Sequence, residues 1–281
     1  MSSSESGFPI EYQGFKMLIT LVEPQRLHPH EEIIPPNLDK LKASIWRDGF
    51  QASPIIVDQE TLVVLDGMHR LATLKDIGCR FILSCLVDYY DPRISVETWC
   101  RGLRDRGVDP LALVEDAGYP THPSGDRWGE SLMLATPEGW HQIGEGLGVE
   151  EAFRALVALE EEFKGKGFAI DHISEAQVEE GLASGTLEAA LVPPRVGKEQ
   201  VVSYALEGRL FPPKSTRHVL PARPIDVDIP LEDLMDQGIS LAEAVDKLVG
   251  VLSGLEVEER PPGATYHGRV YSEALIRFKE A

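Results

Sequence analysis

Cysteine is scarce in this sequence, and long hydrophobic runs are missing from it. The three cysteines form no CxxC pair and no Cys/His set with zinc-ligand spacing, so neither a disulfide framework nor a structural zinc site is expected. No apolar run approaches the roughly 20 residues of a membrane-spanning helix. The polar segment 1–7 lacks the basic start and apolar centre of a signal peptide. We therefore expect a cytoplasmic protein with no membrane partner.

Positive charge is also in short supply. The 281 residues include 27 Lys and Arg against 46 Asp and Glu, a formal net charge of -19. Such a chain repels polyanions, so a nucleic-acid partner is not expected. With 43% hydrophobic and 26% charged residues, the composition is typical of a globular protein. The length suffices for one large domain or two ordinary ones.

The few basic residues are unevenly distributed. Residues 145–188 are dominated by acidic side chains, whereas residues 195–223 hold six Lys or Arg against Glu199 and Glu207. A basic cluster in an acidic chain indicates a place for an anionic ligand. Helix-end and surface charges scattered by chance remain an equally good explanation of the charge pattern alone.

The first ninety residues have the pattern of a compact α/β unit. Short apolar runs predict strands, and segments with apolar residues at helical spacing predict helices. The predicted strands are 17–22, 54–57, 62–65 and 81–87. The predicted helices are 37–48 and 69–77, which end at Gly49 and Gly78.

Beyond Asp91-Pro92 the pattern changes, and we predict a domain boundary there. Residues 1–92 form the first predicted domain, and 93–281 form a mostly helical second domain that contributes substrate-binding residues near 214–218. Residues 118–148, rich in Gly and Pro, are expected to be loops. The predicted helices of the second domain are 95–106, 110–117, 150–163, 198–207 and 241–252.

The strongest functional signal is the sequence LVVLDGMHR at 62–70, where a buried strand runs through Asp-Gly directly into a helix. The first turn of a helix presents unpaired backbone N–H groups and a partial positive charge, which suit a phosphate. Gly67 allows a sharp turn and close ligand approach, and Arg70 can grip phosphate through two hydrogen bonds. An Asp-Gly turn with Asp66 as a simple helix cap is the alternative. The predicted phosphate-binding residues are Asp66, Gly67, Met68, His69 and Arg70.

The order of motifs resembles the ParB/sulfiredoxin fold, and within it the free L-serine kinases. The matching segments are Pro-His-Glu-Glu at 29–32, a helix that ends in Gly49, Pro-Ile-Ile-Val-Asp at 54–58, and the Asp-Gly box at 66–70. The kinases carry Asp-Gly-His-His-Arg, so Met68 departs from their pattern. A backbone contact survives that change, but a side-chain contact from this position does not.

A second segment, FPPKSTRH at 211–218, is similar to the Pro-Pro-Lys-Thr-Thr-Arg-His segment of the same kinases and falls inside the basic cluster. Two cations, a histidine and two hydroxyls suit a phosphate and a carboxylate. A Pro-rich linker is the alternative. The two matches cover about residues 17–90 and 198–224.

The resemblance implies a kinase that transfers a phosphoryl group from a nucleotide, ADP or ATP, to free L-serine or a similar small hydroxy amino acid. Glu31 corresponds to the general base, although Glu32 remains an alternative, and Asp66 and His69 complete the implied catalytic set. No side-chain motif for a metal is present; Mg²⁺ is expected to bind through the phosphates, with Asp66 as a candidate ligand. The implied substrate-binding residues are Ser44, Trp99, Lys214, Ser215, Thr216, Arg217 and His218.

Two other functions compete with this interpretation. A ParB-like module that binds CTP or another nucleotide and assists DNA binding would share the fold, but the charge of -19 disfavours it. Sulfiredoxin-like repair needs a Cys after the Gly of the phosphate box, where this sequence has Met68. The donor nucleotide and the oligomeric state are left open by the sequence.

Overall fold

The computed structural model describes residues 6–104, 107–266 and 268–280. The chain forms two compact units. Unit 1 comprises residues 1–95, 201–210 and 218–281, and unit 2 comprises residues 96–200 and 211–217. A single boundary at residue 92 therefore does not describe the chain, because its last third returns to unit 1.

Unit 1 contains a six-stranded sheet with the strand order β1-β2-β7-β5-β6-β3. The β5–β7 and β3–β6 pairs are parallel, and the other neighbours are antiparallel. Every residue of β5 and β7 is buried, as expected for apolar strands in the middle of a covered sheet. The strands are β1 (Phe8–Tyr12), β2 (Phe15–Val22), β3 (His28–Pro29), β5 (Ile55–Asp58), β6 (Val63–Asp66) and β7 (Ile82–Val87).

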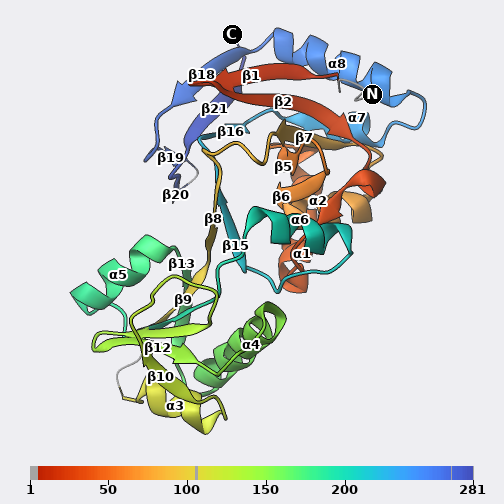
Figure 1. Ribbon diagram of the computed structural model, residues 1–281. Coiled ribbons are helices and arrows are strands. Elements are labelled where there is room, and N and C mark those ends of the chain that lie inside the picture. Colours follow the sequence, from red (N-terminus) through yellow and green to blue (C-terminus); the bar gives the residue numbers. More distant parts are fainter. Residues whose placement is uncertain (1–5, 105–106, 267, 281) are drawn as a thin grey trace. The chain divides into compact units, whose positions relative to one another are not determined.

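The helices of unit 1 end where the sequence predicts. Helix α1 (Pro35–Asp48) stops at Gly49 and α2 (Met68–Ile77) stops at Gly78, both in the left-handed conformation that glycine adopts easily. These two helices pack against each other. Helix α8 (Leu241–Ser253), begun by a capping box of Ser240 and Glu243, packs on β1 and β2 (Figure 1).

The last part of the chain adds small sheets to unit 1. Strand β16 (Ala222–Ile225) runs parallel to β21 (Ala274–Lys279), which pairs on its other side with β18 (Glu256–Arg260). The remaining elements are short, except for α6, which starts in unit 2. They are η1 (Pro24–Arg26), β4 (Phe50–Gln51), α6 (Lys198–Leu206), β17 (Ile229–Pro230), α7 (Leu231–Met235), β19 (Thr265–Tyr266) and β20 (Arg269–Val270).

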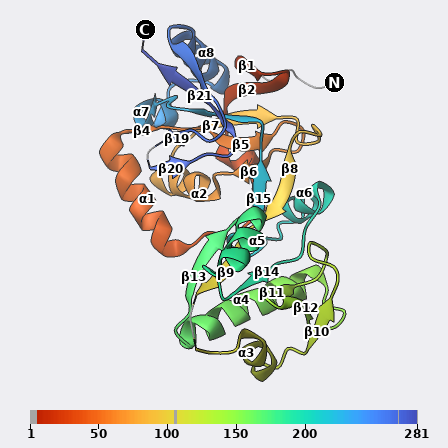
Figure 2. The ribbon, with the colours of Figure 1, turned by 90° about the vertical axis from the view of Figure 1, so that its left-hand side faces the viewer.

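Unit 2 is built on an antiparallel six-stranded sheet with the order β10-β12-β11-β14-β9-β13 (Figure 2). Apolar side chains of the sheet and of α5, among them Cys100, Met133 and Val178, form a buried core. The elements are β9 (Cys100–Arg104), α3 (Pro110–Asp116), β10 (Thr121–Ser124), β11 (Met133–Thr136), β12 (Gly139–Ile143), α4 (Val149–Gly165), β13 (Ala169–Ile173), α5 (Glu175–Ser184) and β14 (Ala189–Val192).

Two predictions of secondary structure are wrong. The predicted helix 95–106 is instead β8 (Ser95–Thr98), which pairs with β15 (Thr216–Val219), followed by β9, while residues 105–106 lie outside the described residues. Gly102 disfavours a helix and suits the sheet, because a Cβ there would lie 2.8 Å from Ile173 Cδ1. The predicted loop region 118–148 contains β10, β11 and β12. The region after residue 93 is thus mixed rather than mostly helical.

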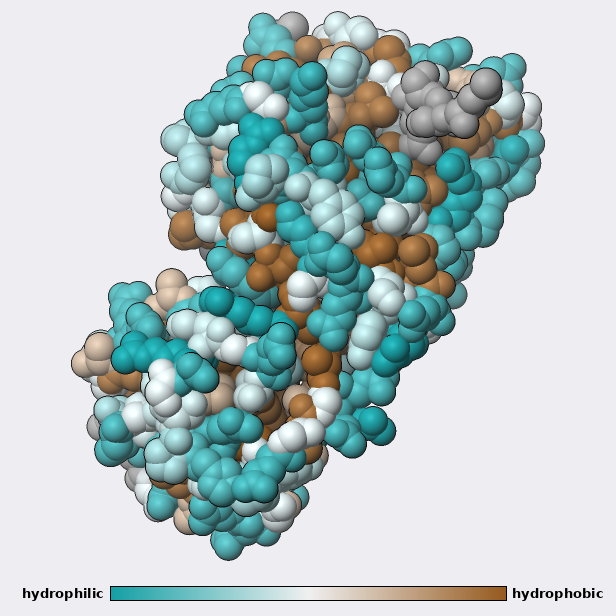
Figure 3. Space-filling view, in the orientation of Figure 1, coloured by the Kyte–Doolittle hydropathy of each residue, from teal (hydrophilic) through white to brown (hydrophobic). Residues whose placement is uncertain are grey.

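None of the helices that the structure describes is long and apolar enough to cross a membrane. On the face shown in Figure 3, hydrophilic residues cover most of the surface and hydrophobic residues lie in separate patches.

Candidate functional site

The turn between β6 and α2 has the geometry that the sequence predicts for an anion site. Gly67 has φ of 102° and ψ of 24°, a backbone conformation that side chains rarely adopt, and α2 begins at the next residue, Met68. A Cβ at position 67 would lie 2.6 Å from Cγ2 of the fully buried Ile55. Only glycine fits this turn without displacement, and it leaves the first amides of a ten-residue helix at the strand end.

Two arginines converge on the carboxylate of Asp66. Arg70 Nη2 lies 3.3 Å and Arg223 Nη1 lies 2.7 Å from Asp66 Oδ2. Arg70 also donates to the carbonyl oxygens of Ser53 at 2.8 Å and Pro54 at 2.7 Å. The guanidinium of Arg70 thus holds together the turn at Asp66 and the loop at Ser53 and Pro54, which precedes β5.

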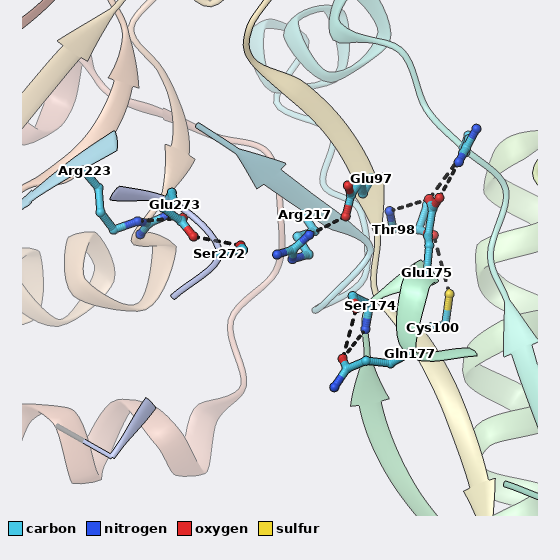
Figure 4. A network of polar contacts seen from close by, with 11 residues as sticks. Glu97, Thr98, Cys100, Ser174, Glu175, Gln177, Arg217, Arg223, Ser272 and Glu273 are labelled. Atoms are coloured by element: carbon cyan, nitrogen blue, oxygen red, sulfur yellow. Dashed lines mark hydrogen bonds and ion pairs between the residues drawn. The ribbon is translucent and has the colours of Figure 1, made fainter. Parts of the chain in front are cut away.

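Arg223 is held on its other side by Glu273. Arg223 Nε lies 2.8 Å from Glu273 Oε1, and Ser272 Oγ donates to Glu273 Oε2 at 3.0 Å (Figure 4). Burial lowers the pKa of Arg223, but the carboxylates of Asp66 and Glu273 outweigh it and raise the pKa above its ordinary value. Arg223 is therefore a permanent cation next to the turn at Gly67.

A cavity of about 340 Å³ opens beside this ion-pair network within unit 1. Of the residues that the sequence singled out, Ser44, Asp66 and Arg70 line it, together with Arg223. Asp48, Gln51 and Ser53 add polar side chains to the wall, which also contains aromatic and aliphatic side chains. The aromatic and aliphatic residues are Leu41, Ile45, Phe50, Ile56, Ile225 and Tyr271. A wall of mixed polar and apolar side chains that includes two arginines can accept a flat apolar group carrying an anion.

The candidate base Glu31 is buried, with 9% of its surface exposed, and follows the fully buried His30. His30 Nδ1 donates to the carbonyl oxygen of Val64 at 2.6 Å, which leaves Nε2 directed toward Glu31 Oε1 at 3.9 Å. Burial lowers the pKa of His30, although Glu31 opposes this shift. A carboxylate beside a neutral imidazole can accept a proton. Glu32, the alternative base, is exposed.

His218, the last residue of the FPPKSTRH segment, lies in unit 1 against His30. The two rings meet edge to face with centroids 5.2 Å apart, and Tyr89 Oη lies 2.8 Å from His218 Nε2. His218 is buried at 7% exposure. The structure thus brings the end of the second motif next to the Pro-His-Glu-Glu motif.

His69 ties the start of α2 to the segment that carries Glu31. Its Nε2 accepts a hydrogen bond from the backbone N–H of Ile34 at 2.9 Å. This ring nitrogen is therefore unprotonated.

Ser44, another residue singled out from the sequence, lies on α1 and donates a hydrogen bond through Oγ to Asp48 at 3.0 Å.

The other candidate serine-binding residues lie in unit 2, around the ring of Trp99. Lys214 Nζ is 5.4 Å and Arg217 Cζ is 5.6 Å from the ring centroid, which is cation–π distance. Arg217 also forms an ion pair with Glu97 (Figure 4). Ser215 and Thr216 are buried at 0% and 5% exposure. Together these residues form a cationic surface on one aromatic ring, which suits a carboxylate or a phosphate.

Among the residues that the structure describes, no group of three or more His, Cys, Asp and Glu could hold a metal ion. Asp66, the candidate ligand, is engaged by two arginines.

Several site residues were not singled out from the sequence. Arg223 was within the basic cluster 195–223, so that signal was present but not assigned to the phosphate turn. Glu273, Tyr89 and Tyr271 carry no motif, and only the fold brings them to the site.

No family model matches this chain. It is 26% identical over 232 residues to an ADP-dependent L-serine kinase of Thermococcus kodakarensis, with 78% of this chain and 94% of that protein covered. It is 27% identical over 235 residues to an ATP-dependent L-serine kinase of Desulfurococcus mucosus, with 76% and 90% covered.

The fold is similar to that of solved serine kinases. A free serine kinase in complex with AMP aligns with a TM-score of 0.64 at 24% identity, over 77% of this chain and 93% of that one. This likeness confirms the predicted α/β class. In sequence, over about three quarters of its length, the chain is similar to the L-serine kinases that the motifs at 66–70 and 211–218 resemble.

Proposed function

We propose that this protein transfers a phosphoryl group from a nucleotide to the hydroxyl of free L-serine, which gives O-phospho-L-serine. The observation that carries the proposal is the turn at Gly67, where helix amides and two arginines meet beside a cavity, in a chain similar to L-serine kinases. Free serine and a nucleotide are both cytoplasmic metabolites, so the expected cytoplasmic location stays part of the proposal.

The nucleotide phosphates bind at the start of α2 in this proposal. The amides of Met68 and His69 and the guanidinium of Arg70 supply donors, and Arg223 adds a second cation. The nucleobase lies in the 340 Å³ cavity against apolar side chains such as Phe50. Mg²⁺, when bound to the phosphates, supplies charge neutralisation at the transferring group.

Glu31 acts as the general base. The serine Oγ forms a bond to the terminal phosphorus of the donor while the bond from that phosphorus to the leaving nucleotide oxygen breaks. The hydroxyl proton passes to the Glu31 carboxylate. Burial of Glu31 beside the neutral ring of His30 excludes water from this proton transfer. Asp66 and His69, also expected to be catalytic, act here by holding Arg70, Arg223 and the segment before α1 in place.

The candidate serine-binding residues are assigned unit by unit. In unit 2, Lys214 and Arg217 on the ring of Trp99 attract the serine carboxylate, and the buried Ser215 and Thr216 shape the turn and the strand start between them. Two further residues implied by the resemblance, Ser44 and His218, belong to unit 1. These assignments rest on the similarity of the segment at 211–218 to the kinases and on the charge of the cluster.

The test is an assay of the purified protein with L-serine, Mg²⁺ and ADP, ATP or CTP in separate reactions. We expect O-phosphoserine with ADP or ATP. Glu31→Gln should lower kcat about 100- to 10,000-fold, while Glu32→Gln, a change at the adjacent exposed residue, should leave it within about twofold of the unmodified enzyme. If no donor gives O-phosphoserine and the protein binds CTP or DNA tightly, the kinase proposal is wrong and the function of a ParB-like regulator is favoured.

A further inference from the structure

Arg101 is a buried arginine on an interior strand of the unit 2 sheet. It lies on β9 between β13 and β14, and 2% of its side chain is exposed. A buried guanidinium must satisfy its donors within the protein, because leaving it unpaired is costly. The positions of its acceptors therefore show what this residue holds in place.

One carboxylate and three backbone carbonyls accept hydrogen bonds from Arg101. Nε donates to Glu160 Oε2 on α4 at 3.0 Å. Nη1 donates to the carbonyl oxygens of Trp99 and Lys214, each at 2.7 Å, and Nη2 donates to that of Pro213 at 3.2 Å. A single side chain thus joins the strand that carries Trp99 to the turn that carries Lys214.

The turn at 212–215 needs such support. Lys214 has φ of 61°, the left-handed conformation that is unfavourable for a residue with a Cβ. Ser215 Oγ donates to the carbonyl oxygen of Pro212 at 2.7 Å and closes the turn from inside. The bonds from Arg101 to positions 213 and 214 hold it from the other side.

We propose that Arg101 is a positioning residue for recognition of the amino-acid substrate. By fixing the backbone at both Trp99 and Lys214, it keeps the Lys214 ammonium over the Trp99 ring at 5.4 Å. Arg101 binds carbonyls rather than substrate, so it acts through these two neighbours. The inference rests on the proposed serine kinase function and assigns to Arg101 the affinity for serine, not the affinity for the nucleotide.

The test compares Arg101→Met and Arg101→Lys with Arg104→Met. Arg104 lies on the same strand, and its only role in the described contacts is an exposed ion pair with Asp171 at 2.8 Å. We expect Arg101→Met to raise KM for serine on the order of 10- to 100-fold, with KM for the nucleotide and binding of AMP unchanged. Arg101→Lys, which keeps a charge opposite Glu160, should recover part of the loss. Arg104→Met should match the unmodified enzyme.

Amide hydrogen exchange gives a second readout that needs no serine. We expect faster exchange of residues 213–217 in Arg101→Met and unchanged exchange in Arg104→Met. Equal increases of KM for serine and nucleotide, or unchanged exchange of the turn, would overturn the proposal. If the unmodified enzyme forms no O-phosphoserine, the kinase function fails, and the exchange result alone decides whether Arg101 positions the turn. If Arg101→Met does not fold, the same measurements on Arg101→Lys decide.

Discussion

Replacing Gly67 by alanine tests the phosphate-binding turn through two separate costs. The first is conformational, because φ at this position is 102°. The second is steric, because the new Cβ would lie 2.6 Å from Cγ2 and 3.0 Å from Cβ of Ile55. Carbon atoms pack at about 3.5–4.0 Å, and Ile55 is fully buried, so it has little room to move.

The magnitude follows from these two costs. A residue with a Cβ loses about 1–2 kcal/mol in the left-handed region, and forced overpacking of a core costs about 1–3 kcal/mol. Gly67→Ala should therefore lower the free energy of unfolding by about 2–5 kcal/mol. Gly78→Ala is the matched control at the other end of α2: φ is 91° and nothing lies within 4 Å of the added Cβ, so only the conformational cost applies.

The assay is urea unfolding followed by far-ultraviolet circular dichroism, with binding of AMP as a second measurement. Gly67→Ala should be less stable than Gly78→Ala by about 1–3 kcal/mol. Ile55→Leu removes Cγ2 at nearly constant volume, so the double variant should recover part of this difference. Equal stability of the two alanine variants would refute the steric argument, and unchanged AMP affinity in Gly67→Ala would refute the placement of phosphate at this turn.

Three further outcomes follow from the ion pairs, the buried histidines and the buried thiols. Arg223→Met leaves the carboxylates of Asp66 and Glu273 without their shared cation, and loss of one partner of a buried pair costs about 3–5 kcal/mol. Because 40% of the Asp66 side chain is exposed, urea unfolding should show a loss of stability at the lower end of this range. A loss below about 1 kcal/mol, which is typical of a surface ion pair, would contradict this prediction. Burial lowers the pKa of His30 below 6.5, so the unfolded chain binds its proton first and stability should fall as pH drops below about 6.5. His172, whose pKa burial also lowers, adds to that slope, and His172→Asn separates the two; a flat profile in His172→Asn would show that His30 does not contribute. Burial raises the pKa of the three thiols to about 11 or 12, so none should react with a disulfide reagent at pH 8 until the chain unfolds, and fast labelling of the native protein would contradict their burial.

The sequence predicts the first ninety residues well because their signals are local. Gly49 and Gly78 each end a helix in the conformation that glycine tolerates, and the apolar runs that become β2, β5 and β7 are too short for helices. The geometry of the strand-Asp-Gly-helix pattern at 62–70 is likewise determined locally, because the strand end, the turn and the helix start are adjacent in sequence. Such elements need little help from the rest of the chain.

Unit 2 shows where local signals fail. The segment 95–104 has helix-compatible spacing, but β9 becomes a central strand because β13 and β14 pair with it on both edges. Those partners lie more than sixty residues later in the sequence, and their pairing outweighs the local preference of single residues. The strands within 118–148 are short and bounded by Gly and Pro, so nothing in the segment itself separates them from loops.

The same reasoning explains which site residues the sequence reveals. Gly67, Arg70 and Glu31 belong to sequence motifs. The second arginine at the Gly67 turn, Arg223, comes from β16 instead, and its other ion-pair partner, Glu273, immediately precedes β21. Parallel pairing of β16 with β21 brings these two together across 50 residues, and no spacing rule could do so. The basic cluster at 195–223 nevertheless contained Arg223. A buried arginine needs carboxylates as partners, and Arg223 pairs with Asp66 of the Asp-Gly box and with Glu273. The clustering of charge pointed to the part of the chain that supplies Arg223, and only the fold could show which arginine reaches the turn at Gly67.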